Sequence, residues 1–147
     1  MRAAVDLLSQ YAEYHRDRRN IVSHFIGVPM IVFAVGVLLA HPTFVLGETL
    51  LTPAWLLFAP VAAWYLTRGN LMLGLAVSLQ VAALLWLGQM VGGGSVAGWL
   101  GWGVGFFVAG WVIQFVGHWY EGRKPAFVDD IVGLLVGPMF VSAEGMV

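Results

Sequence analysis

The sequence has no cysteine and very little charge. Disulfides, thiolate catalysis and cysteine-ligated zinc or iron–sulfur sites are therefore excluded. Lys, Arg, Asp and Glu make up 10% of the 147 residues, against about 25% in a soluble domain. Between Arg19 and Glu121 the charged residues are Glu48 and Arg68 alone, and the mean hydropathy of the chain is +0.84. Water could not solvate a surface built from that stretch, so we predict a single integral membrane domain covering residues 1–147.

Long apolar runs divide the sequence into candidate membrane helices. A transmembrane helix needs about 17–25 predominantly apolar residues. Four runs approach or reach this length: Ile21–Ala40, Leu50–Leu66, Leu71–Val91 and Trp99–Trp119. The segments "HPTFVLGETLLTP" and "GGGS" are polar or flexible breaks between them. We therefore predict an all-α integral membrane helical bundle of about four transmembrane helices, of which the second is the shortest and contains Pro60.

Two shorter helices are expected at the ends of the chain. Residues 3–16 repeat apolar side chains at helical spacing, which predicts an amphipathic helix on the membrane surface or against the bundle. The run Ile131–Ala143 would form only about 20 Å of helix, which is too short to span a membrane. Because Pro138 interrupts this run, we predict a re-entrant or interfacial helix there.

Basic residues lie on one side of the predicted bundle. They occupy the N-terminal segment, the second loop and the segment after the fourth span: Arg16, Arg18, Arg19, Arg68, Arg123 and Lys124. The other two loops contain no Lys or Arg. The positive-inside rule therefore predicts that the N-terminus and the residues after Tyr120 are cytoplasmic. We take the membrane to be a bacterial inner membrane.

Three of the four histidines fall at the cytoplasmic boundary of this topology. They are His15, His24 and His118, whereas His41 lies at the opposite boundary. Histidine is the commonest metal ligand, and ionisable residues within membrane segments mark functional sites. His118 and Glu121 share a helix face at a spacing found in iron sites of helix bundles, although a local hydrogen bond would use the same spacing. The pattern predicts a metal or cofactor site at this boundary.

Convergence of His15 and His24 requires a break in the helix between them, which we expect as a turn near Asp17–Asn20. Their separation of nine residues puts them half a turn out of phase on one straight helix. Asn20 is expected to cap a new helix that begins at Ile21. The Gly-Val-Pro segment that follows His24 is expected to kink or restart that helix.

Two segments resemble a small family of membrane-bound iron(II)-dependent 2-hydroxy fatty acid dioxygenases. They are "YHRDRRNIVSHFIGVP" and "WVIQFVGHWYEGRKPAFVDDIV", and the resemblance extends from about Tyr11 to Ile131. Members of that family α-oxidise 2-hydroxy fatty acids to fatty acids one carbon shorter, and the fungal member acts in phytosphingosine breakdown in the endoplasmic reticulum. The resemblance implies the same activity here, with a lipid acid and O2 as substrates.

The resemblance also implies a set of site residues. The family pattern maps onto His15, Asn20, His24, Pro29, Gln114, Phe115, Gly117, His118, Glu121, Pro125 and Ala126. It implies an iron(II) ion, Fe(2+), held by His15, His24 and His118. Glu121 would be either a fourth ligand or a carboxylate that orients an imidazole. His41 is in neither segment, so we leave it outside the site.

The implied substrate has an anionic head and an apolar tail. Candidate residues for binding the head are Arg16, Arg19, Asn20, Gln114, Arg123 and Lys124. The cations among them equally serve as the charges that set topology. Four small residues are expected to allow close helix approach or to open a groove for the tail: Gly103, Gly105, Gly110 and Gly117.

Three functions of other classes are alternatives. A non-enzymatic haem- or metal-binding protein would also use histidines on neighbouring helices. A small transporter is expected to have charged residues in the middle of its spans, whereas the polar residues there are glutamines. A purely structural membrane protein would not need three histidines on one face. Nucleic acid is not an expected partner, because the net charge of −1 provides no basic surface.

Overall fold

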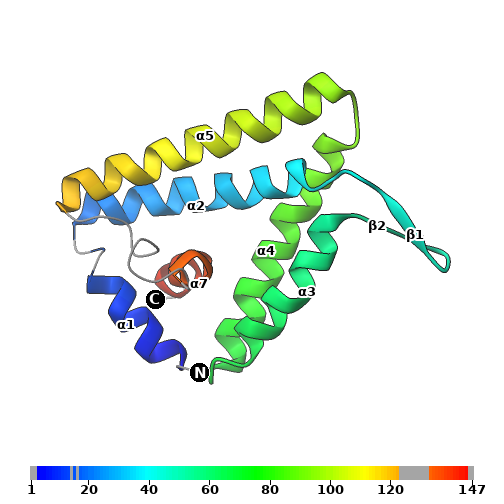
Figure 1. Cartoon of the computed structure of the whole chain (residues 1–147). Coiled ribbons are helices and arrows are strands. Elements are labelled where there is room, and N and C mark those ends of the chain that lie inside the picture. Colours follow the sequence, from blue (N-terminus) through cyan, green and yellow to red (C-terminus); the bar gives the residue numbers. More distant parts are fainter. Residues whose placement is uncertain (1–2, 14, 16, 123–132, 146–147) are drawn as a thin grey trace.

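The chain forms two helix pairs that diverge from a shared corner. The computed structural model describes residues 3–13, 15, 17–122 and 133–145. One pair consists of α2 (Arg18–Leu38) and α5 (Val96–Glu121), and the other of α3 (Pro53–Leu66) and α4 (Leu71–Gly92) (Figure 1). The pairs meet where α2 packs on α4, while α1 (Ala4–Glu13) and α7 (Gly133–Gly145) close the open side. This architecture confirms the predicted all-α fold.

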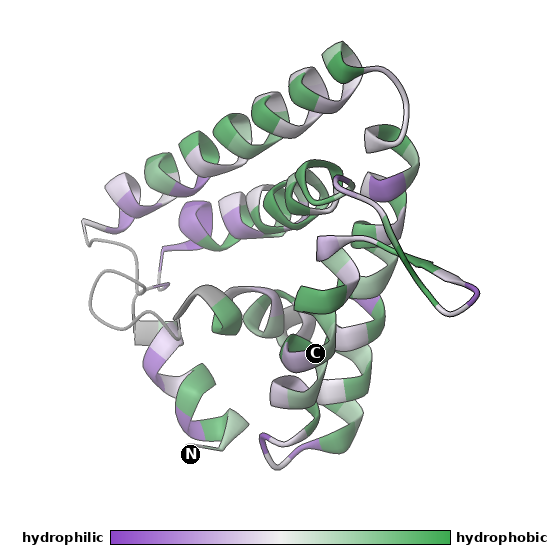
Figure 2. Ribbon diagram, turned by 45° about the vertical axis from the view of Figure 1, so that its right-hand side comes forward, coloured by the Kyte–Doolittle hydropathy of each residue, from purple (hydrophilic) through white to green (hydrophobic). Residues whose placement is uncertain are grey.

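Within the described residues, three helices are long and apolar enough to cross a membrane. They are α2, α4 and α5, with 21, 22 and 26 residues. Figure 2 shows hydrophobic residues along most of their length and hydrophilic residues where α2 begins. The expected span Leu50–Leu66 is not one helix, because a two-stranded hairpin of β1 (Phe44–Leu46) and β2 (Thr49–Leu51) precedes α3. With 14 residues, α3 extends about 21 Å, short of the roughly 30 Å hydrocarbon core.

The start of α2 differs from the expected one. The helix begins at Arg18 rather than Ile21, because Asp17 caps it by accepting a hydrogen bond from Arg19 N at 2.9 Å. Asn20 therefore lies inside the helix and is completely buried. The helix also continues through Pro29 without the expected restart. A proline removes one backbone hydrogen bond from the helix, so Pro29 weakens α2 locally without ending it.

Small residues bring α2 and α5 into close contact. Gly103, Gly110 and Gly117 form a seven-residue repeat that faces α2. A Cβ atom on Gly110 would lie 2.7 Å from Ile31 Cγ1, which leaves no room for a side chain. The expected close approach is therefore confirmed at these three positions. Gly105 instead lies in a surface groove beside Trp102, where a Cβ atom would meet nothing.

The C-terminal helix α7 is part of the core. It packs on α1, α4 and α2, and its Val136, Met139 and Phe140 are at most 3% exposed. Tyr65 on α3 donates a hydrogen bond to Leu135 O at 2.7 Å and so joins the second helix pair to α7. The predicted short helix is present, although residues 131 and 132 lie outside the described part of the chain.

Candidate metal centre

Three buried histidines converge at the start of α2. His15 follows α1, His24 is on the second turn of α2, and His118 is on the last turn of α5. Their ring centroids are 4.2 to 5.0 Å apart, and none of the three side chains is more than 4% exposed. One ring nitrogen from each lies within 4.8 Å of the others, so the cluster can hold a metal ion. The predicted convergence of these three histidines is confirmed.

The hydrogen bonds of His15 and His24 determine which ring nitrogens are free. His15 Nδ1 donates to Tyr11 O at 2.7 Å, and His24 Nδ1 donates to Asn20 O at 2.9 Å. A carbonyl oxygen only accepts, so both Nδ1 atoms carry a proton. In the neutral rings, each Nε2 atom then presents a lone pair, and these two atoms are 2.8 Å apart. Two lone pairs this close to each other repel unless both nitrogens bind one cation.

A metal ion satisfies this arrangement better than a proton does. Burial, together with repulsion from a charged His24, lowers the pKa of His15 from 6.5 to about 3, so a proton is poorly held there. Two nitrogens that each bind one metal ion at about 2.1 Å stand roughly 3.0–3.4 Å apart, somewhat more than the observed 2.8 Å. Imidazoles that bind metals commonly donate their other N–H to a backbone carbonyl, as both rings do here.

His118 supplies a third unsatisfied nitrogen. Its Nδ1 atom is buried and has no hydrogen-bond partner within the described residues. A buried polar atom without a partner costs about 1–3 kcal/mol, so a ligand that bound this nitrogen would be stabilising. Three neutral nitrogen donors suit zinc, copper, iron or nickel and leave further coordination positions open.

Aromatic rings that the sequence did not single out enclose His15. The Tyr11 ring stacks on it with centroids 4.0 Å apart and planes 11° apart, and Phe140 on α7 lies 5.3 Å away. Burial raises the pKa of the Tyr11 hydroxyl, which therefore stays protonated at neutral pH. The spacing of four residues between Tyr11 and His15 was the available signal, but it indicated only an apolar helix face.

The Glu121 carboxylate joins the end of α5 to the start of α2. Its Oε2 atom accepts hydrogen bonds from Asp17 N at 2.5 Å and from Asn20 Nδ2 at 3.4 Å. Among the described residues, the three histidines are the side chains close enough to share a metal ion, so this contact favours the orienting role over the ligand role. The backbone carbonyl of Asn20 in turn accepts a hydrogen bond from His24 Nδ1. Asn20 therefore connects the Glu121 carboxylate to the His24 ring of the cluster.

We expect Glu121→Gln to keep bound metal and Glu121→Ala to lose it. Glutamine retains an oxygen that can accept from Asp17 N, whereas alanine does not. Loss of an outer partner of a metal ligand typically weakens metal affinity by about 10–100-fold. Metal titration of both variants measures the difference. If glutamine lost the metal as completely as alanine, the carboxylate itself would be a ligand.

The remaining predicted residues lie in different places. Gln114 is 5% exposed, one turn before His118, and its Oε1 atom has no partner within the described residues. Arg19 is at the surface, where it pairs with Asp17 at 3.0 Å and covers the Tyr120 ring. Arg16, Arg123 and Lys124 lie outside the described residues.

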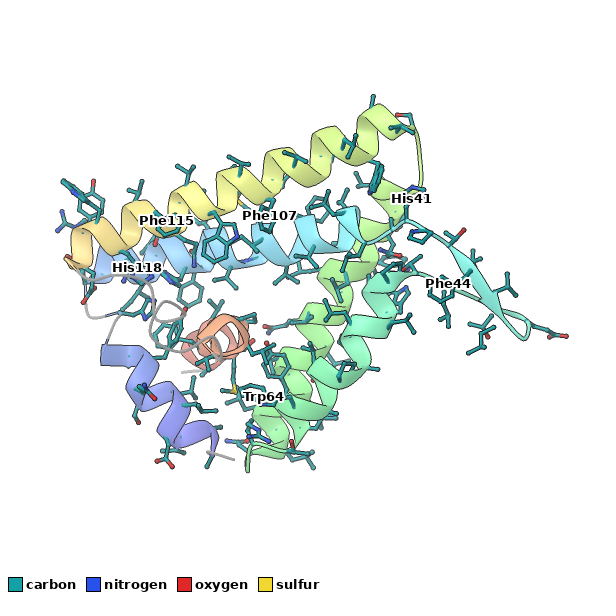
Figure 3. The ribbon with its side chains drawn as sticks, viewed as in Figure 1. His41, Phe44, Trp64, Phe107, Phe115 and His118 are labelled. Atoms are coloured by element: carbon teal, nitrogen blue, oxygen red, sulfur yellow. The ribbon has the colours of Figure 1, made fainter. Side chains whose placement is uncertain are left out.

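His41 is at the far end of α2 from the cluster, as Figure 3 shows. Its Nε2 donates to Gly92 O at 2.9 Å, and its ring contacts Trp99. These contacts connect the loop after α2 to α4 and α5. They give His41 a structural role apart from the cluster.

A cavity of about 400 Å³ extends from the cluster into the bundle. Small-molecule sites typically measure about 300–1,000 Å³. Its lining includes the polar side chains of His24, Gln114 and His118 at the cluster, and most of the rest of the wall is apolar. Helix α2 contributes His24, Val28, Ile31, Val32 and Val35. His24 and Val35 are separated by about 16 Å of helix, so the cavity is a deep apolar site with imidazoles at one end.

Comparison with known proteins gives two matches. The model of the family described as 2-hydroxy-palmitic acid dioxygenase Mpo1-like matches residues 1–146. The chain is also 30% identical over 145 residues to the 2-hydroxy-palmitic acid dioxygenase MPO1 of Saccharomyces cerevisiae. That alignment covers 95% of this chain and 79% of the yeast protein. No solved structure matches.

Proposed function

Because this chain belongs to the Mpo1-like family, we propose that it is a membrane dioxygenase acting on 2-hydroxy fatty acids. It converts them to fatty acids one carbon shorter, with O2 and a histidine-bound iron(II) ion. The conversion balances without a further reductant when the carboxyl carbon leaves as carbon dioxide and water is the second product. The substrate then supplies all the electrons that O2 takes up.

The facing Nε2 atoms of His15 and His24 are the observation that carries this proposal. They are 2.8 Å apart, buried, and both oriented by carbonyl oxygens, which is the arrangement of two ligands of one metal ion. With His118 they would hold iron(II) and leave positions open for exogenous ligands. Iron(II) supplies the redox chemistry that lets O2 react with an organic acid.

The cavity supports a lipid substrate. Its apolar wall would take the acyl chain, and its polar end would hold the carboxylate and the 2-hydroxyl near the histidines. Gln114 Oε1, which lines this end, would accept a hydrogen bond from the 2-hydroxyl. We propose that Asn20 keeps His24 in position and that Arg19, Arg16, Arg123 and Lys124 attract the anionic head.

We also propose that this end of the bundle faces the cytoplasm of a bacterial cell. The basic residues of the sequence are concentrated at the same helix ends as the histidines. A lipid acid whose carboxylate stays at this boundary would place its C1–C2 bond beside the cluster and its tail within the bundle.

A haem-binding role is less consistent with this geometry. A haem held by two axial histidines has the macrocycle between the two nitrogens. The 2.8 Å between His15 Nε2 and His24 Nε2 leaves no room for it. The colour of the purified protein gives an immediate check, because haem absorbs strongly in the visible range and mononuclear iron(II) with imidazole ligands does not.

Removal of the metal is expected to abolish turnover reversibly. Protein purified in mild detergent without chelator should contain about one iron per chain and shorten 2-hydroxy-palmitic acid by one carbon. Chelation should stop the reaction, and anaerobic iron(II) should restore it, whereas zinc should not. Mass spectrometry of the acid products measures the outcome, with palmitic acid as the control that lacks the hydroxyl. Iron-loaded protein that forms no shortened acid would contradict the proposal.

A further inference from the structure

The cavity reaches the molecular surface beside α3 and α5, and on α5 it does so about halfway along the helix. Leu57 on α3 and Phe107 on α5 both line it, yet they are 47% and 37% exposed. A residue that both lines a cavity and faces outward stands at its mouth. Phe107 is labelled near the middle of α5 in Figure 3. The mouth is therefore flanked by α3 and α5.

The helix pairing explains why the wall opens here. Helix α3 packs on α4, whereas α5 packs chiefly on α2, so α3 and α5 belong to different arms of the fold (Figure 1). Side chains of α7 line part of the cavity wall between these arms, including Leu135 and Pro138. The opening results from the divergence of the two pairs rather than from a missing side chain.

The position of the mouth matches the depth of an acyl chain. Phe107 is 11 residues before His118, about 16 Å along α5. If His118 lies at the membrane boundary, Phe107 lies near the middle of a hydrocarbon core of about 30 Å. Both sides of the mouth are apolar, so it opens toward lipid tails.

We propose that this mouth is a lateral entry through which the acyl chain of a single-chain lipid acid slides from the bilayer into the cavity. The carboxylate stays at the boundary beside the histidines while the tail crosses between α3 and α5. No charged group then has to enter the apolar wall, which would be costly. The inference rests on the proposed function for the identity of the acid, and it adds the source of the substrate and its route.

Single cysteines offer a direct test, since the natural chain has none. Leu57→Cys and Phe107→Cys each place one thiol at the mouth. Val108→Cys is the matched control, because Val108 adjoins Phe107 on α5 and is 53% exposed but does not line the cavity. Each variant is reconstituted in nanodiscs, kept anaerobic, and treated with an apolar maleimide with and without 2-hydroxy-palmitic acid.

The long-chain acid should slow modification at positions 57 and 107 and leave position 108 unaffected. With free ligand at ten times its Kd, the unoccupied fraction and hence the rate fall about elevenfold. Short 2-hydroxybutyric acid at the same concentration should not protect, because its chain does not reach the mouth. Equal rates with and without the long acid at both mouth positions, in variants that keep wild-type metal content, would overturn the lateral entry.

Protection and turnover separate this inference from the proposed function. Protection is read without O2, so it does not depend on catalysis. Protection at the mouth by an acid that the iron-loaded protein never shortens would contradict the proposed function and leave the entry standing. Turnover of the long acid without protection at either mouth position would contradict the entry and leave the function standing.

Discussion

We expect the His24→Ala variant to purify without iron and without turnover of 2-hydroxy-palmitic acid, although its helices remain folded. His24 contributes one of the two Nε2 atoms that face each other at 2.8 Å. Loss of an outer partner already lowers metal affinity by about 10–100-fold, and loss of a ligand should lower it further. Elemental analysis and product analysis of the same preparation measure both effects. His118→Ala should behave in the same way.

The control for this loss is His41→Ala. His41 follows the opposite end of α2 and donates to Gly92 O, so its removal costs about 1 kcal/mol of stability and no metal. Circular dichroism should show equal helix content in both variants. A His24→Ala protein that retained iron at the wild-type ratio would place the metal elsewhere, and an inactive His41→Ala protein of normal stability would mean that the site extends across the bundle.

The membrane fold and the histidine cluster were predictable because each depends on a property of whole segments. Depletion of charge from residue 20 to residue 120 excludes a water-solvated surface whatever the details of packing. The distribution of basic residues among the loops assigned His15, His24 and His118 to one end, where the structure brings their rings together. Their spacing also required a break; α1 ends at Glu13 and α2 begins at Arg18, ahead of most of the turn expected near Asp17–Asn20.

The start of α2 was not predictable because two residues compete for the same role. Asp17 and Asn20 are both favourable caps. Asp17 caps the helix in the structure, where its carboxylate also pairs with Arg19 and its backbone N–H donates to Glu121, 104 residues away. Patterns among neighbouring residues in the sequence cannot indicate that long-range contact.

The cavity was not predictable in detail because it depends on the register of several helices. An acyl slot was expected from small residues on α5, but these bring α5 against α2 and close that interface. The open volume arises where α3 and α5 diverge around α7. The stacking of Tyr11 on His15 likewise depends on how α1 docks and not on its apolar periodicity.

The corner of the fold depends on backbone contact between α2 and α4. A Cβ atom on Gly88 would lie 2.6 Å from both Phe33 O and Val37 N. A Cβ on the facing Gly36 would lie 2.8 Å from Leu85 Cα. These neighbours are backbone atoms of helices, so they cannot rotate away. Because Leu85 lines the cavity, the crossing also determines where α4 forms the cavity wall.

We therefore expect Gly88→Ala to destabilise the protein strongly, while Gly101→Ala does not. The added methyl group must separate α2 from α4, and overpacking of this kind costs about 1–3 kcal/mol, occasionally more. Gly101 is on exposed α5 surface where a Cβ atom meets nothing, so alanine there should raise stability by up to about 1 kcal/mol through helix propensity. Thermal unfolding of both variants in the same detergent measures the contrast. Because the shift moves Leu85, Gly88→Ala should also weaken binding of long-chain acids more than it weakens metal binding. Equal midpoints for the two variants would mean that the helices do not approach this closely.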